Sequence, residues 1–333
     1  MLIQNNNIYK IGSFTNTHDK LPMGIYRLRQ DPRTFEFYLI KVEDFKIPSK
    51  LYGDLSSADR ILNTYKNSDK NLAALFLGSQ GSGKTIEAKL ICSKASVPTI
   101  IIDEYFDDSN IINFLSSPEL EGCIIFIDEY EKLYSASQEE TIMLQLLDGA
   151  CNAKHLFLLT ANSTNRMSGH LLNRPSRIFY RKAYTGIESD VLEEILDNEL
   201  INQKWRDELN EVFNKFTELT FDIVMSLLRE VNLYDESPIK CAKMMNFVPQ
   251  PVYVEITQIF NDGSIVSGDP MTLDFSDNDF DIKIYKNANI DSGYKWKSIS
   301  VKDVTRINKN TWEIKDSNCR IVFTKSSLIN QLF

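Results

Sequence analysis

The sequence has few of the residues that build disulfide bonds or zinc sites. Its 333 residues include five cysteines, an odd number without a C-x-x-C pair, and three histidines that are not spaced as a ligand set. Scattered thiols are typical of a reducing compartment, and a structural zinc site needs closely spaced thiolates or imidazoles. We therefore expect no disulfide, no structural zinc and a cytoplasmic location.

Long hydrophobic runs and an excess of basic charge are also missing. No stretch approaches the ~20 apolar residues of a membrane helix, and residues 1–7 have neither the basic start nor the apolar centre of a secretory signal. The formal net charge of −9 gives no global attraction to nucleic acid or to an anionic membrane. We expect a soluble protein with no membrane partner, and we favour protein partners over nucleic acid, which would need a local basic channel.

The chain does contain a glycine-rich turn between an apolar run and a helical pattern. Residues 75–85 read Leu-Phe-Leu-Gly-Ser-Gln-Gly-Ser-Gly-Lys-Thr, the G-x-x-x-x-G-K-[ST] pattern of a phosphate loop. Glycines let successive N–H groups converge on one anion, and the following helix directs its positive end at that anion. Lys84 would reach the β- and γ-phosphates, and Thr85 would ligate Mg²⁺. The predicted nucleotide-binding residues of this loop are Gly78, Ser79, Gln80, Gly81, Ser82, Gly83, Lys84 and Thr85.

A second apolar run ends in two adjacent carboxylates. Residues 123–127 predict a buried strand that leads to Asp128 and Glu129, and open α/β sheets bind ligands at the carboxyl ends of their strands. Asp128 would hold Mg²⁺, and Glu129 would polarise the water that attacks the γ-phosphate. A strand ending in Asp-Glu is common by itself. After a phosphate loop it is the expected Walker B half of an ATPase site, and it weakens the alternative of a glycine-rich turn with an incidental Lys-Thr pair.

Other nucleotide-binding classes lack support in the sequence. A GTPase would carry an Asn-Lys-x-Asp guanine reader, and an ABC-type ATPase would carry a Leu-Ser-Gly-Gly signature; neither motif occurs. A small-molecule kinase has no need of a water-activating glutamate beside the magnesium-binding aspartate. The paired carboxylates therefore favour a nucleotide hydrolase.

The hydrophobic period changes twice along the chain. Strands alternate with helices at first, a helical period follows, and an alternating period typical of strands begins after Pro251. In the first part we expect a hairpin of 24–29 and 35–42, a helix over 57–66, a helix over 84–96 with Ile86, Leu90 and Ile91 inward, a strand over 99–102, a helix over 138–148 capped by Ser137 and Glu140, and strands over 155–162 and 178–181.

These patterns predict an α/β protein with several domains. The core would be a P-loop three-layer α/β fold with a helical lid, preceded by a short β-hairpin segment and followed by a small all-β domain. The expected boundaries are 1–46 for the hairpin segment, 47–186 for the ATPase core, 187–250 for the lid and 251–333 for the all-β domain.

Together these motifs resemble the AAA+ ATPases, in particular the AAA clade with its Rieske-protein-translocase-like and phage-encoded branches. The resemblance covers roughly residues 47–250 and implies a ring, usually a hexamer, that binds ATP and Mg²⁺ and hydrolyses ATP at subunit interfaces. It also implies that the ring pulls a substrate through its pore. The segments that carry the resemblance are 78–85, 124–129, 158–162 and 171–177.

The same resemblance implies roles for single residues. Asn162 would be sensor 1, which helps Glu129 to position the attacking water, although an amide here could simply cap a strand. Arg177 would be the arginine finger for the neighbouring subunit's γ-phosphate, with a surface charge as the alternative. The position of a second finger is Tyr180 here, followed by Arg181. The segment that would border the adenine is Tyr52, Gly53 and Asp54, and the position of the pore loop is Tyr105 and Phe106.

The first functional interpretation is an AAA+ ATPase that remodels or translocates a protein substrate. One alternative is a nucleic-acid-directed motor or helicase loader, and another is an ATP-binding assembly factor with weak turnover. The charges of residues 251–333 are close to balanced, which argues against an oligonucleotide-binding barrel. We expect this domain to recruit a protein partner, and the alternative is that it only buttresses the ring.

Overall fold

The structure of the chain is a computed structural model with two compact units, residues 1–184 and 185–333, which are treated separately below. The described residues are 2–5, 7–11, 17–134, 140–150, 153–216, 218–247, 251–275, 279–289, 293–308, 310–316 and 318–326. No helix within these ranges is long and apolar enough to cross a bilayer.

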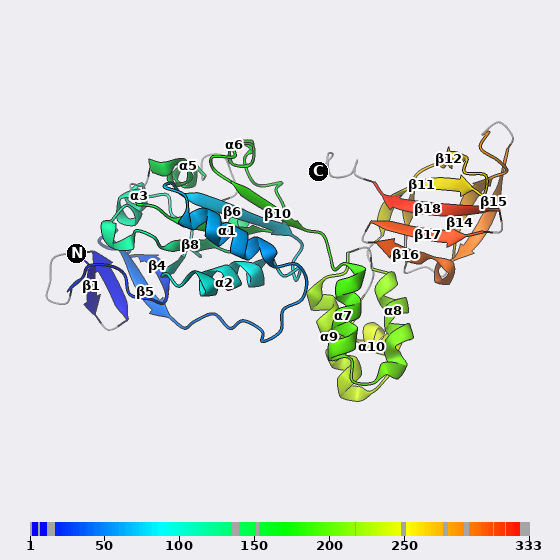
Figure 1. Cartoon of the computed structure of the whole chain (residues 1–333), viewed down its shortest axis with the longest axis horizontal. Coiled ribbons are helices and arrows are strands. Elements are labelled where there is room, and N and C mark those ends of the chain that lie inside the picture. Colours follow the sequence, from blue (N-terminus) through cyan, green and yellow to red (C-terminus); the bar gives the residue numbers. More distant parts are fainter. Residues whose placement is uncertain are drawn as a thin grey trace. The chain divides into compact units, whose positions relative to one another are not determined.

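The first unit is built on a ten-stranded sheet (Figure 1). Half of it is a parallel block in the order β10-β6-β9-β8-β7. Helices can cover both faces of a parallel sheet, so its strands are buried on both faces. The sequences of β6, β8 and β9 are accordingly apolar almost throughout. The bounds are β6 Leu72–Gly78, β7 Thr99–Ile101, β8 Ile124–Ile127, β9 Leu156–Ala161 and β10 Tyr180–Tyr184, the last beginning two residues later than expected.

The predicted N-terminal hairpin is present and continues the same sheet. Strands β4 (Ile25–Gln30) and β5 (Phe37–Val42) pair antiparallel, and β4 also pairs parallel with β7. The outer strands are β2 (Ile8–Ile11), β1 (Leu2–Asn5) and β3 (Thr17–His18). The hairpin therefore supplies the strand that borders the parallel block.

Helix α2 (Lys84–Ala95) buries a different face from the predicted one. Ile91 is inward as expected, but Ile86 and Leu90 are only half-buried, and Glu87 occupies the buried face in their place. The reason is that the Glu87 carboxylate is hydrogen-bonded by three half-buried side chains, Ser57, Lys182 and Tyr184. The other helices of this unit are α1 (Ser56–Lys66), α3 (Asn110–Leu115), α4 (Tyr130–Leu133), α5 (Thr141–Gln145) and α6 (Gly169–Leu172).

The predicted helix over 138–148 is shorter in the described residues. Helix α5 continues into a π-helical turn at Leu146–Ala150, where Gly149 takes φ 89°. The proposed cap residue Ser137 lies outside the described residues. Glu140 is fully buried, and its carboxylate accepts from the Ser168 backbone N–H at 3.2 and 3.1 Å, so it supports the start of α6.

The second unit contains a helical part and a β part, as the change of period predicted (Figure 1). The helices are α7 (Ser189–Glu199), α8 (Arg206–Asn214), α9 (Phe221–Tyr234) and α10 (Pro238–Met244). Pro238 occupies the first turn of α10, where its missing N–H has no cost.

The β part of this unit has a main sheet in the order β12-β11-β18-β17-β16, with β13 also on β11, and a separate β14–β15 ribbon. Trp312 is fully buried in its apolar core, where its ring centroid lies 5.6 Å from that of Phe275. Residues 301–303 form a 3₁₀ turn between β15 and β16. The bounds are β11 Val252–Phe260, β12 Ile265–Ser267, β13 Met271–Leu273, β14 Asp279–Tyr285, β15 Tyr294–Ser300, β16 Thr305–Asn308, β17 Thr311–Lys315 and β18 Cys319–Lys325.

Candidate active site

The glycine-rich turn connects the end of β6 to the start of α2. Gly83 precedes the helix with φ 98°, a conformation that favours glycine. At Gly78 a Cβ atom would lie 2.5 Å from the Tyr184 carbonyl oxygen, so the strand can approach β10 only without a side chain. The first N–H groups of α2 have no intrahelical acceptor, and the Ser82 hydroxyl is buried without a partner among the described residues. The turn thus has donors that suit an anion.

Lys84 is held beneath this turn by two oxygen atoms. Its side chain is 5% exposed, and Nζ donates to the Ser79 carbonyl at 3.1 Å and to Asn162 Oδ1 at 2.8 Å. Burial lowers the pKa of the ammonium, while the carboxylates of Asp128, Glu131 and Glu129 act in the opposite direction. Lys84 is therefore fixed between the phosphate loop and the end of β9.

Asp128 joins the phosphate-loop helix to two strands. Its Oδ1 accepts from Thr85 Oγ1 at 2.8 Å and from Thr160 Oγ1 at 2.5 Å. The Thr160 hydroxyl accepts in turn from the Glu129 backbone N–H at 2.9 Å. Thr160 was not predicted from the sequence; its only signal is a hydroxyl near the end of a fully buried apolar strand.

The neighbouring oxygens of Thr85 and Asp128 fit a Mg²⁺ site. Mg²⁺ is commonly bound through one or two protein oxygens together with substrate phosphates and water. Within the described ranges, no group of three or more His, Cys, Asp or Glu side chains could hold a metal ion. A site completed by nucleotide phosphates agrees with this donor set.

Glu129 and Asn162, the two residues expected to act on the attacking water, are in contact with each other, and Asn162 also contacts Lys84. Glu129 adopts a left-handed backbone conformation with φ 54° and ψ 49°, which is uncommon for a residue with a side chain and clusters at functional sites. Its Oε1 contacts Lys132 Nζ at 2.7 Å and accepts from Asn162 Nδ2 at 3.3 Å. These contacts with Lys132 and then Asn162 lower the pKa of Glu129, so the carboxylate is kept ionised.

Arg177 is buried within the first unit of the chain. Its side chain is 8% exposed, with Nε and Nη2 donating to the Asp148 carboxylate at 2.7 and 2.5 Å and Nη1 to the His170 carbonyl at 2.7 Å. These hydrogen bonds lower the pKa of Asp148 and raise the pKa of Arg177. Arg174 is exposed, forms no ion pair with any described residue, and lines a hollow of about 380 Å³.

The predicted adenine segment, Tyr52 to Asp54, is tied to the edge of the core sheet. Lys182 Nζ donates to the Asp54 carbonyl at 2.7 Å and to Glu87 Oε2 at 2.7 Å. Glu87 is fully buried and also accepts from the hydroxyls of Ser57 and Tyr184. The only indication of this network in the sequence is a glutamate on an otherwise apolar helix face.

The two aromatic residues at the predicted pore-loop position have different environments. Phe106 is buried, and its ring packs on Phe37 with centroids 5.4 Å apart. Tyr105 is exposed and lies against Tyr134 at 5.5 Å. Phe106 is therefore part of the core, and only Tyr105 offers a ring to the surface.

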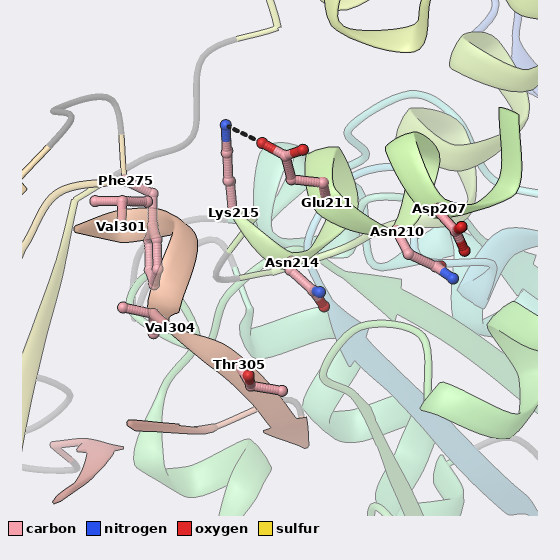
Figure 2. A pocket seen from close by; sticks show the side chains of 9 residues that line it. All are labelled: Asp207, Asn210, Glu211, Asn214, Lys215, Phe275, Val301, Val304 and Thr305. Carbon is pink, nitrogen blue, oxygen red and sulfur yellow. Dashed lines mark ion pairs between the residues drawn. The ribbon is translucent and has the colours of Figure 1, made fainter. Parts of the chain in front are cut away.

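The second unit has a hollow with different chemistry (Figure 2). It measures about 260 Å³ and lies between α8 and the residues around the start of β16. Figure 2 shows an apolar wall of Phe275, Val301 and Val304 on one side, and on the other an ion pair between Lys215 and Glu211 at 3.5 Å. This paired charge and apolar wall do not form a phosphate or metal site, so the candidate active site is the cluster around Lys84.

The match to a known protein family includes that location. Residues 74–183 match AAA, the ATPase family associated with various cellular activities, and the comparison with curated proteins gave no match. Among solved structures, the chain is similar to a point mutant of Thermotoga maritima RuvB, at 15% identity and TM-score 0.45 over 61% of this chain and 73% of that chain. It is also similar to the T. maritima RuvB Holliday junction branch migration motor, at 16% identity and TM-score 0.43 over the same shares. Likeness at this level carries no argument about a substrate.

Proposed function

The chain carries an AAA-family ATPase domain at residues 74–183 and hydrolyses ATP with Mg²⁺, and from this premise we propose that it is a ring-forming motor for a protein substrate. The observation that supports a motor with turnover is the contact chain from Lys84 through Asn162 to Glu129. It links a phosphate-binding side chain to the carboxylate that would act on water. A ring, usually a hexamer, is the assembly that the resemblance implies.

The side chains of this site divide the work of hydrolysis. The N–H groups of the phosphate loop and Lys84 would bind the phosphates, while Thr85 and Asp128 would hold Mg²⁺. Bound there, Mg²⁺ neutralises charge on the phosphate oxygens. Glu129, kept ionised by Lys132, would polarise the attacking water and accept its proton at the carboxylate, and Asn162 would help to position that water.

We place a trans-acting arginine in the turn formed by residues 174–177. Arg177 was the predicted finger, and to act on a neighbour it would have to leave Asp148. Arg174 is already exposed and would not have to leave an ion pair to reach a neighbour. The simplest arrangement is that Arg177 anchors the turn through Asp148 while Arg174 reaches the neighbouring γ-phosphate.

A protein substrate is supported by the charge of the chain. The net charge of −9 disfavours a polyanion as the general partner. The test is a pull-down with Glu129→Gln protein loaded with ATP from source-cell lysate, and Lys84→Ala protein is the control because it should not load. Recovery of a protein by the first variant alone supports the proposal, and recovery of nucleic acid alone contradicts it.

One observation favours a nucleic-acid motor as the second candidate. On the β14–β15 ribbon, Tyr294 is 48% and Trp296 62% exposed, and Lys283 Nζ lies 4.9 and 5.6 Å from the two ring centroids. Exposed aromatic rings beside a cation can stack unpaired bases. Salt-sensitive binding of single-stranded DNA that Trp296→Ala abolishes would select this candidate. Tight ATP binding without turnover would instead select the assembly-factor alternative.

A further inference from the structure

Glu131 is a buried carboxylate that the ATPase mechanism above leaves without a role. It lies on α4, two residues after Glu129, and its side chain is 5% exposed. Its Oε1 accepts from both the backbone N–H of Asn162 at 2.9 Å and Nδ2 of Asn162 at 2.8 Å. Its Oε2 is buried without a partner among the described residues. Burying a carboxylate with one oxygen unsatisfied is costly, which calls for a reason at this position.

The contacts on the Asn162 side chain supply that reason. A side-chain amide has a carbonyl that accepts and an NH₂ group that donates, so a half-turn exchanges the two. In the structure Nδ2 faces Glu131 and Glu129, and Oδ1 faces the Lys84 ammonium at 2.8 Å. The reverse orientation would place the carbonyl oxygen against two carboxylates and the NH₂ group against an ammonium.

Of the two carboxylates, Glu131 contributes more to this orientation, because it is the closer to Nδ2. Its Oε1 lies 2.8 Å from Nδ2, whereas Glu129 Oε1 lies at 3.3 Å and also binds Lys132. The second hydrogen bond of Glu131, to the Asn162 backbone N–H, fixes the end of β9 at the same time. The carboxylate therefore holds both the backbone and the amide of one residue.

We propose that Glu131 is a positioning residue that orients the Asn162 amide, so that its NH₂ group faces Glu129 and its carbonyl oxygen faces Lys84. This inference rests on the proposed function, in which Glu129 and Asn162 act on the attacking water. Glu131 itself touches neither nucleotide nor water in this scheme; it acts through Asn162. The alternative is a purely structural carboxylate at the end of β9.

The test compares ATP turnover of Glu131→Ala, Glu131→Gln and Glu131→Asp in the full-length protein. Glutamine keeps an oxygen at the Oε1 position, so we expect kcat within about 3-fold of wild type. Alanine removes the acceptor. We expect kcat to fall about 10- to 100-fold, which is the loss typical when a hydrogen-bond partner that orients a metal ligand is removed. We expect KM for ATP to change less than about 2-fold, because the phosphate contacts of Lys84 and the loop are retained.

A double-mutant cycle separates positioning from a structural role. If Glu131 acts through Asn162, Glu131→Ala should slow Asn162→Ala protein no further, since coupled residues are not additive. Additive losses would overturn the inference, as would full activity of Glu131→Ala or a Glu131→Gln protein as slow as Glu131→Ala. If Glu131→Ala does not fold, Glu131→Asp provides the same cycle, because it withdraws Oε1 by one methylene.

Two controls distinguish failure of this inference from failure of the proposed site. Glu129→Gln and Asn162→Ala should each lose turnover while they still bind ATP. If both retain wild-type turnover, the assignment of the water-activating residues is wrong. If both are slow while Glu131→Ala is normal, only the positioning role is wrong.

Discussion

The two units of the molecule bury charge in different amounts. Among the described residues, the first unit buries five charged side chains, Lys84, Glu87, Glu131, Glu140 and Arg177, whereas the second unit buries only Glu313. The β part of the second unit instead has an apolar core of aliphatic and aromatic residues that includes Trp312. Buried charges contribute little net stability when an apolar core could replace them.

The buried charges of the first unit indicate that the placement of side chains matters more there than their contribution to the free energy of unfolding. Lys84 and Glu131 contact Asn162 of the nucleotide site directly, and Glu87 binds Lys182, which in turn donates to the Asp54 carbonyl of the adenine segment. Arg177 and Glu140 hold the loop and helix that follow β9. Substitutions in the first unit should therefore change ATP chemistry. Substitutions in the β part should change stability or partner binding.

The largest expected effect separates binding from hydrolysis within the first unit. Lys84→Ala should abolish ATP binding, because Lys84 is the charged side chain of the phosphate loop. Glu129→Gln should keep ATP binding and lose about 10²-fold or more in turnover, the scale of general-base catalysis. Calorimetry measures the first effect and phosphate release the second. Near wild-type hydrolysis by Glu129→Gln would refute the Walker B assignment.

The next effect concerns the two arginines of the turn. Arg174→Ala should lower turnover by about 10³-fold, the scale of arginine-finger losses, with no change in melting temperature. Arg177→Ala should lower turnover too and also the free energy of unfolding, by roughly 1–3 kcal/mol, because it leaves a partly exposed Asp148 without its partner. Both variants should still bind ATP.

Asp148→Asn is the control that distinguishes Arg177 as the anchor of the turn from Arg177 as the arginine finger. If Arg177 anchors the turn, Asp148→Asn should lose turnover as Arg177→Ala does. If Arg177 is itself the finger, freeing it from Asp148 should leave turnover intact. Mixing the Arg174→Ala and Lys84→Ala proteins should restore partial activity if the finger acts in trans, whereas no recovery would place it in cis.

A smaller effect is expected at the buried charge beside the adenine segment. Lys182→Met would leave the fully buried Glu87 without its cation and should lower the free energy of unfolding by about 3 kcal/mol. The double variant Glu87→Gln/Lys182→Met should recover part of this loss in a denaturation experiment. Lys182→Met and the double variant should both raise KM for ATP, because the hydrogen bond from Lys182 Nζ to the Asp54 carbonyl is lost. Unchanged stability of Lys182→Met would show that Glu87 is satisfied by its hydroxyl partners alone.

The smallest effect on hydrolysis is expected from removing the β part. A chain ending at Gln250 should keep ATP turnover within about 3-fold, because no predicted phosphate-handling residue follows Arg177. It should lose the protein recovered in the pull-down. Abolished ATPase activity in a well-folded truncation would contradict the contrast between the two units.

The parts of the site that were predictable are those whose chemistry is local in the chain. The phosphate loop and the Asp128-Glu129 pair are recognisable because each is a short motif at the end of an apolar run. Thr160, Glu131 and Glu87 were missed because their roles depend on partners about 30 to 100 residues away, which spacing within a single element cannot show.

The fold shows the same division between local and distant information. Continuous apolar runs predicted the parallel strands, and turn residues predicted the hairpin of β4 and β5. The predicted inward face of α2 was wrong at Ile86 and Leu90 because the prediction used hydrophobicity alone. Glu87 is buried on that helix instead, and Lys182 of β10 stabilises its carboxylate. Polar burial was therefore the main source of error.

The order of strands in the sheet also bears on how the chain folds during synthesis. Strand β6 ends in the phosphate loop, yet its two neighbours are β9 and β10, and Ala74 pairs with Tyr180. At about 5–20 residues per second, the ribosome needs roughly 5–20 s to make the intervening chain. The nascent phosphate loop thus waits, with an apolar strand unpaired on both edges, until most of the first unit has emerged. Chaperone dependence of the newly made chain should accordingly peak during that interval.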